Sequence, residues 1–253
     1  MGRSVRVQAF VLRTVDFGER DRVVSLLSRE RGKLSAFARG ARSSRRRFGG
    51  ALEPFTRLAA ELRERPGAEL WTLDDVFVER GHGAIRGDLA RIACAGYACE
   101  LARELVRDAE PHPELFDLLA GYLEALDGAP ARPGDLRAFE MGALRVAGLQ
   151  PRLDACARCG ERLEEGDPSV RLRFDPGQGG LLCRACGDSA SAACPPIRLG
   201  TALALSRLPG GGELPPGGLA EARQVLCTFI EHHLGHRLAS RRFLDEMGHA
   251  LKG

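Results

Sequence analysis

The spacing of the apolar residues changes near Gly87, and this change constrains the fold more than any other feature of the chain. Up to about Val78, apolar residues alternate with polar ones in short runs that turn residues interrupt, which is typical of β-strands. After Gly87 they recur every three or four residues, which is typical of amphipathic helices. The sequence therefore predicts an α+β protein in which the strands come first.

The first 80 residues predict a small antiparallel β-barrel of the OB-fold type. Five short strands fit in this range, and no helical segment between them is long enough to form a crossover. The strands are expected at about residues 5–11, 23–27, 34–38, 55–62 and 70–78. Residues 40–50 hold too many glycines and polar side chains for a regular element, so we expect a mobile loop there.

Helical spacing fills most of the remaining chain. Asp88 and Asp135 are plausible N-caps, and Pro113 is a typical first helical residue. The helices are expected at residues 88–105, 113–128, 135–148, 199–208 and, as one long helix, about 219–247. The predicted organisation is a barrel at 1–80, a mostly helical domain at 81–150 and 190–253, and a cysteine module at 151–189 inserted into that domain.

Two Cys-x-x-Cys-Gly segments lie in this module, from Cys156 to Cys159 and, 23 residues further on, from Cys183 to Cys186. In each, a tight turn brings two thiolates to one metal ion, and the following glycine permits the turn. Four sulfur ligands predict one structural Zn²⁺ in a zinc-ribbon-like module, with no open position for catalysis. An iron–sulfur cluster is the alternative, and Cys194 is an alternative ligand. We expect the zinc to hold the module together rather than to contact DNA.

Basic charge is concentrated at the amino terminus. The net charge of the chain is +3, but residues 1–65 carry +9, which leaves −6 for the other 188 residues. A glycine-bounded arginine loop of this kind can follow a phosphate backbone while an aromatic ring stacks on a base. The residues expected to bind nucleic acid are Lys33, Arg39, Arg42, Arg45, Arg46, Arg47 and Phe48.

Several classes of protein are disfavoured. The longest stretch without Asp, Glu, Lys or Arg is nine residues, at 189–197, which is too short to cross a bilayer. The amino terminus lacks the apolar core of a secretory signal, so we expect a cytoplasmic protein. We find no phosphate-binding loop, dinucleotide fingerprint or Gly-x-Ser-x-Gly motif, and we expect no enzyme.

Short motifs along nearly the whole chain resemble the RecO family of recombination mediators in bacterial DNA repair. Besides the four paired cysteines they include Phe139-Glu140 with Leu144. The others are AFVL at 9–12, ERD at 19–21, GKL at 32–34, ARGAR at 38–42, LEPF at 52–55, GLQP at 148–151 and LASRRFL at 238–244.

The resemblance implies an OB-fold barrel, a helical domain and a zinc module, and a role without covalent catalysis. It implies binding of single- and double-stranded DNA, annealing of complementary strands, binding of the C-terminal tail of single-strand binding protein, and work with RecR to load RecA. It also implies association with the nucleoid and no membrane partner. Arg241 and Arg242 become candidate DNA contacts, although Ala239 stands where the family pattern has lysine.

Other functions remain open at this point. A zinc-ribbon transcriptional regulator that reads duplex DNA is the main alternative, and it would need a basic helix suited to the major groove. An enzyme that acts on nucleic acid would depend on Mg²⁺ and shorten its substrate. The helical domain is also suited to serve only as a docking platform for another protein.

Overall fold

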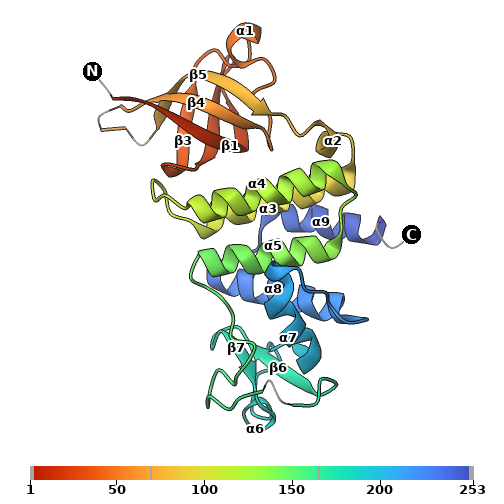
Figure 1. Cartoon of the computed structure of the whole chain (residues 1–253). Helices are drawn as coiled ribbons and strands as arrows, with labels where there is room; N and C mark the ends of the chain where they lie inside the picture. The colour runs from red at the N-terminus through yellow and green to blue at the C-terminus, as the bar shows by residue number, and fades with distance from the viewer. Residues whose placement is uncertain (1–2, 66, 69, 164–165, 251–253) are drawn as a thin grey trace. The chain divides into compact units, whose positions relative to one another are not determined.

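The computed structural model describes residues 3–65, 67–68, 70–163 and 166–250 of the 253-residue chain (Figure 1). The chain forms two compact units, one of Met1–Ala131 with Ala239–Gly253 and the other of Arg132–Leu238. These units do not follow the three predicted segments, because the last helix belongs to the unit that contains the barrel. The three-part organisation stays a prediction.

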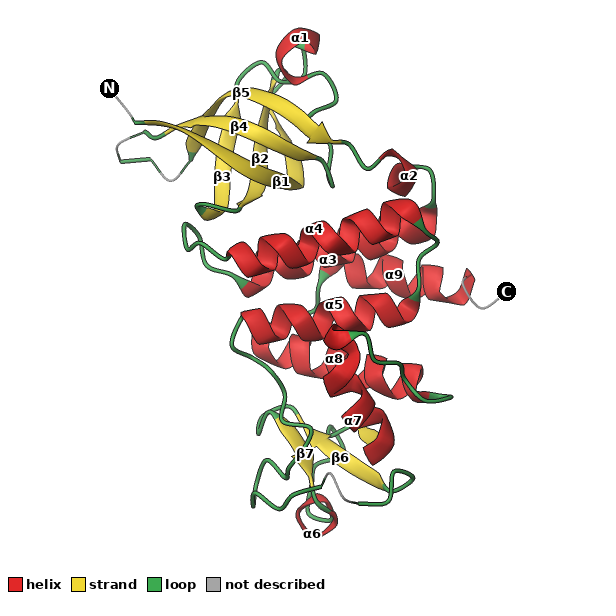
Figure 2. Cartoon of the chain, viewed as in Figure 1, coloured by secondary structure: helices red, strands yellow, loops and turns green. Residues whose placement is uncertain are grey.

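The amino-terminal strands close into a barrel in the order β1-β2-β3-β5-β4, as Figure 2 shows in yellow. All five strands were predicted. Four neighbouring pairs are antiparallel, whereas β3 and β5 pair in parallel through Ala36–Trp71 and Phe37–Thr72. The expected antiparallel barrel is therefore correct except at this closing seam. The strands are β1 Ser4–Phe17, β2 Asp21–Ser28, β3 Gly32–Ala38, β4 Arg57–Arg63 and β5 Trp71–Arg80.

Alternation along β1 fills the barrel, because Val7, Ala9 and Val11 point into its apolar core. Phe10 lies on the other face of the same strand and is also buried. Its ring centroid is 4.9 Å from that of Phe116 in a neighbouring helix. Around Phe10, the outer side of β1 thus packs on a helix instead of facing water.

The helices of this unit are α2 Gly83–Arg86, α3 Leu89–Leu105, α4 Pro113–Gly128 and α9 Ala239–Ala250. The N-cap prediction at Asp88 is confirmed, since its carboxylate accepts a hydrogen bond of 2.9 Å from the Arg91 N–H. The helix predicted at 219–247 is instead two helices. The first ends where Gly235 adopts the left-handed conformation, with φ 72°, and α9 then packs against α3.

The loop expected at 40–50 contains one short helix, α1 Arg45–Phe48. Its last residue, Phe48, is only 2% exposed and belongs to the barrel core. The sequence prediction of an irregular segment is wrong here, because burial of this ring anchors the loop to the barrel.

The second unit combines helices with a three-stranded sheet of order β7-β6-β8. Helix α5 begins at Pro133 with Arg132 as its N-cap, so the cap predicted at Asp135 is wrong. Proline suits the first helical position because it lacks an N–H that would otherwise need a partner. Among the described residues, no helix has the length and apolarity that a membrane crossing requires. The elements are α5 Pro133–Val146, β6 Arg171–Asp175, β7 Gly180–Leu182, α6 Arg184–Gly187, β8 Pro196–Arg198, α7 Leu199–Arg207, a 3-10 turn at Leu208–Gly210, and α8 Gly218–Leu234.

Candidate metal centre and nucleic-acid interface

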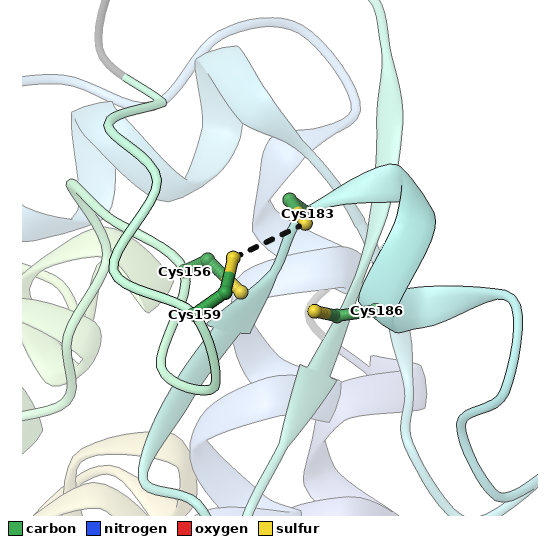
Figure 3. A group of neighbouring side chains, drawn as sticks. All are labelled: Cys156, Cys159, Cys183 and Cys186. Atoms are coloured by element: carbon green, nitrogen blue, oxygen red, sulfur yellow. Dashed lines mark hydrogen bonds between the residues drawn. The ribbon is translucent and has the colours of Figure 1, made fainter.

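The four paired cysteines converge on one point (Figure 3). The sulfur atoms of Cys156, Cys159, Cys183 and Cys186 all lie within 4.8 Å of one another. In the described part of the chain, this is the only group of three or more His, Cys, Asp or Glu residues close enough to share a metal ion. The spacing of the motif therefore identified four thiols that the fold brings together.

The first knuckle is a tight turn held by backbone hydrogen bonds. The Cys156 N–H donates to the Glu161 carbonyl at 2.8 Å, and the Gly160 N–H donates to the Cys156 carbonyl at 2.9 Å. Gly160 has φ 80°, a left-handed conformation that residues with a side chain rarely adopt. The predicted need for glycine is confirmed at this position.

The second knuckle uses a different backbone. Cys183 is the N-cap of α6, and the Gly187 N–H donates to the Cys183 carbonyl at 2.8 Å. Gly187 is the last residue of this short helix and has no left-handed φ, so the glycine was not required there for the turn. Arg158 of the first knuckle donates to the Cys186 carbonyl at 3.2 Å and thereby ties the two knuckles together.

The geometry suits a tetrahedral thiolate site. Ligands at a Zn–S distance of about 2.3 Å stand about 3.8 Å apart, and the sulfur atoms of Cys159 and Cys183 are 3.7 Å apart. Burial of Cys156 raises the pKa of its thiol, but the N–H groups of Cys183, Cys159 and Arg158 outweigh this effect and lower the pKa to about 6. The pKa of the Cys183 thiol shifts the other way: the Cys186 N–H lowers it, but Glu161, burial and the neighbouring thiols outweigh this effect and raise it. Binding of a metal ion must therefore displace protons from this cluster.

The predicted arginines lie at one end of the barrel. Arg39 and Arg47 line a hollow of about 590 Å³ together with Arg63 and Arg65. Arg42 lies in the loop that follows Arg39. Its Nη1 donates to the Gly18 carbonyl at 3.2 Å and its Nε is 3.5 Å from Asp16, but 42% of its side chain stays exposed, so it remains a candidate. The side chains of Arg45 and Arg46 fall outside the described residues.

Two of the contacts predicted in the barrel are placed differently. Phe48 cannot stack on a base, because its ring is in the barrel core beneath the Arg47 guanidinium, 4.5 Å from the ring centroid. Lys33 is engaged inside the unit, since its Nζ donates to the Arg103 carbonyl at 3.0 Å and pairs with Asp108 at 3.2 Å. We therefore leave both residues out of the interface.

The two arginines predicted to contact DNA from the last helix differ in their exposure to solvent. Arg241 is only 8% exposed, with its Nε 2.8 Å from Asp245, so its guanidinium is engaged within the protein and we leave it out of the interface. α9 packs against α3, and this packing covers Arg241. The side chain of Arg242 is 86% exposed and stays a candidate.

Sequence reasoning overlooked two outward-facing aromatic residues, Phe17 and Phe37. The alternation in β3 contained the signal, because Leu34, Ala36 and Ala38 point inward and leave Phe37 on the outer face.

Comparisons with known proteins match both parts of the chain. A family model described as "Recombination protein O N terminal" matches residues 1–80, and one described as "Recombination protein O C terminal" matches residues 86–242. Three relatives, each named "DNA repair protein RecO", cover nearly the full length. The protein of Anaeromyxobacter sp. (strain Fw109-5) is 61% identical over 98% of both chains. That of Myxococcus xanthus (strain DK1622) is 49% identical over 95% of this chain and 96% of its own.

The third relative, from Geobacter sulfurreducens, is 41% identical over 96% of this chain and 98% of its own. Similarity at this level covers nearly the whole length of each chain. The chain therefore belongs to the RecO family of DNA repair proteins.

Proposed function

We propose that this protein is a recombination mediator that binds single- and double-stranded DNA, anneals complementary strands, and acts with RecR and single-strand binding protein to load RecA. The observation that carries the proposal is identity over nearly the whole chain with proteins named "DNA repair protein RecO". This role needs no covalent chemistry, because the protein changes only which strands are held together.

The charge at the end of the barrel supports the DNA-binding part. Two DNA strands repel one another through their phosphates, and a protein that neutralises phosphates lowers that barrier. The exposed residues Arg39 and Arg42 stand on a loop bounded by glycines, where guanidinium groups can follow a backbone without reading its sequence. Such contacts favour binding to any sequence, in single or double strands.

We propose that the four cysteines hold one structural Zn²⁺. A bound zinc ion supplies four strong metal–thiolate bonds, and with all four ligands from sulfur no position stays open for catalysis. Each knuckle provides two cysteines. In each pair the first cysteine is buried, Cys156 in one and Cys183 in the other. Metal analysis of the purified protein tests this: one zinc per chain is expected, whereas iron with labile sulfide would indicate a cluster.

The annealing of complementary oligonucleotides coated with single-strand binding protein tests the proposed function. With this protein added and no nucleotide present, annealing should accelerate, weaken as salt rises, and leave the strands at full length. Absence of acceleration, together with tight binding to one duplex sequence, would favour a transcriptional regulator. Products shorter than the substrate that depend on Mg²⁺ would instead indicate a nuclease.

A variant with Arg39, Arg42, Arg45 and Arg46 changed to Ala tests the interface. Each lost phosphate contact on a single strand removes about 0.7 from the slope of log affinity against log salt, so the slope should become shallower by about 3. Arg47 is kept because its guanidinium donates to the Arg39 carbonyl and covers Phe48.

The control is a double variant, Arg107→Ala with Arg207→Ala, since both residues are exposed and outside the interface. This control should keep the wild-type slope, apart from any change due to net charge. An unchanged slope in the fourfold variant would place the DNA elsewhere, and a lower melting temperature would mean that the loop stabilises the barrel.

A further inference from the structure

Two phenylalanines meet on the outer surface of the barrel instead of in its core. Phe17 is the last residue of β1 and is 59% exposed, and Phe37 is the penultimate residue of β3 and is partly exposed. Their ring centroids are 5.6 Å apart with an interplanar angle of 83°, an edge-to-face arrangement. Each ring therefore restricts the other, while more than half of the Phe17 surface stays open to solvent.

The strand register explains why the two rings meet. Val15 pairs with Val23, and Val23 pairs with Phe37, so these three side chains form one row across the outer face of β1, β2 and β3. Phe17 follows Val15 by two residues and thus projects from the same face. The result is an apolar strip on the surface, and exposed strips of this kind mark binding sites more often than they serve stability.

The strip borders the basic hollow. Phe37 lines the hollow together with Arg39, Arg47, Arg63 and Thr72. Its lining contains four arginines against two carboxylates, so its net charge is positive. Its volume of about 590 Å³ falls in the range of roughly 300–1,000 Å³ that small ligands occupy. An aromatic surface beside guanidinium groups suits a ligand that is both flat and anionic.

We propose that Phe17 and Phe37 form a stacking site for unpaired nucleobases, with the arginines of the hollow holding the adjoining phosphates. This inference rests on the proposed function and adds to it a means of distinguishing single-stranded DNA from duplex DNA. In a duplex the bases are already stacked and paired, so they cannot reach a ring on the protein. Arginine contacts serve both kinds of DNA, whereas the stacking site serves single strands alone.

A protein partner is the competing occupant of an exposed apolar strip. The positive charge of the neighbouring hollow favours a polyanion instead, because an apolar peptide gains nothing from four arginines.

The test compares three ligands of equal length: oligo(dT), the same backbone without bases, and a duplex. Phe17→Ala and Phe37→Ala should each weaken oligo(dT) binding by about 5- to 150-fold, the range measured for base–aromatic stacking. Affinity for the abasic strand and for the duplex should stay within about twofold. Phe17→Trp should retain oligo(dT) binding because indole also stacks.

Phe77→Ala supplies the matched control, since Phe77 is 68% exposed on β5 and does not line the hollow. This control should bind all three ligands like the wild type. The melting temperatures of all variants separate a binding defect from a folding defect. If Phe37→Ala unfolds, the result for Phe17→Ala alone decides the test.

The outcomes separate the inference from the function on which it rests. Wild-type binding to oligo(dT) by Phe17→Ala, or equal losses on all three ligands, would overturn the stacking site and leave the mediator proposal intact. A wild-type protein that neither binds DNA nor anneals strands would overturn the proposed function itself.

Discussion

The barrel and the sheet of the cysteine module are built on different sources of stability. The barrel closes on itself around 15 buried apolar residues contributed by its strands and the loop that contains α1. The sheet has strands of only five, three and three residues. Its apolar face relies on α8, where the ring of Phe229 lies 5.4 Å from that of Phe174. The free end of this sheet is the place where the thiolates converge, which suggests that metal bonds replace a missing core there.

Removal of the metal should give the largest difference in stability between the barrel and the sheet of the cysteine module. Structural zinc contributes about 10–16 kcal/mol in isolated zinc-finger peptides, which exceeds what a few short strands supply. A strong chelator, or Cys183→Ser, should therefore unfold residues 151–198 while the barrel persists. Hydrogen exchange followed by mass spectrometry should show full exchange in peptides from 151–198 and unchanged protection in peptides from 4–63.

The control for this experiment is Cys194→Ser. Cys194 is buried but lies outside the cluster, so the variant should retain one metal per chain. Loss of metal from that variant would revive Cys194 as a ligand, and unchanged protection after metal loss would show that the sheet stands without its metal.

A cavity in the barrel core should reduce stability by a smaller amount, and the loss should be confined to the barrel. Leu58 is fully buried between β1 and β5, and Leu58→Ala should reduce the free energy of unfolding by about 2–5 kcal/mol. Denaturant unfolding measures the loss, while metal content should stay at the wild-type value. Leu89→Ala, at an exposed position, should cost less than about 0.5 kcal/mol. A loss of metal in Leu58→Ala would show that the two regions depend on one another.

Local pattern predicted the strands and the clustering of the four cysteines well, because both depend on neighbours in the sequence. Alternation fixes which side chains of β1 and β3 point inward, and the Cys-x-x-Cys spacing fixes two thiolates per turn. The start of β4 was missed because Phe55 has φ 72°, and its carbonyl lies 2.7 Å from Nδ1 of His82, 27 residues away. No local pattern reveals such a contact.

The same distinction explains the errors in the candidate interface. The sequence shows that Phe48 and Arg241 are beside other arginines, but their burial depends on the barrel core and on α3. Phe37 was accessible to prediction, because the alternation that defines β3 places it outside. Charge clusters therefore indicate a candidate DNA-binding region, whereas tertiary packing decides which of their members reach the solvent.

The smallest expected effect concerns Glu100, whose carboxylate attaches the C-terminal helix to the barrel-containing unit. It accepts hydrogen bonds from the Ala239 N–H at 3.1 Å and the Ser240 N–H at 2.7 Å, at the first turn of α9. Burial raises the pKa of Glu100, but the hydrogen bonds from Ser240 and Ala239 outweigh it, so the pKa lies below its ordinary value of 4.5. Since the folded pKa is lowered, this carboxylate stabilises the fold above about pH 4.5 and ceases to do so as the pH falls through the lowered value.

Glu100→Gln should therefore destabilise the docking of α9 by about 1 kcal/mol at pH 7, the usual cost of a lost helix cap. The variant should also lose the part of the acid sensitivity that Glu100 contributes. Hydrogen exchange in peptides from 239–246 measures both effects, and peptides from 151–198 should stay unchanged at pH 7. If α9 in the variant loses protection on acidification as steeply as in the wild type, a titratable group other than Glu100 controls the pH dependence of this junction.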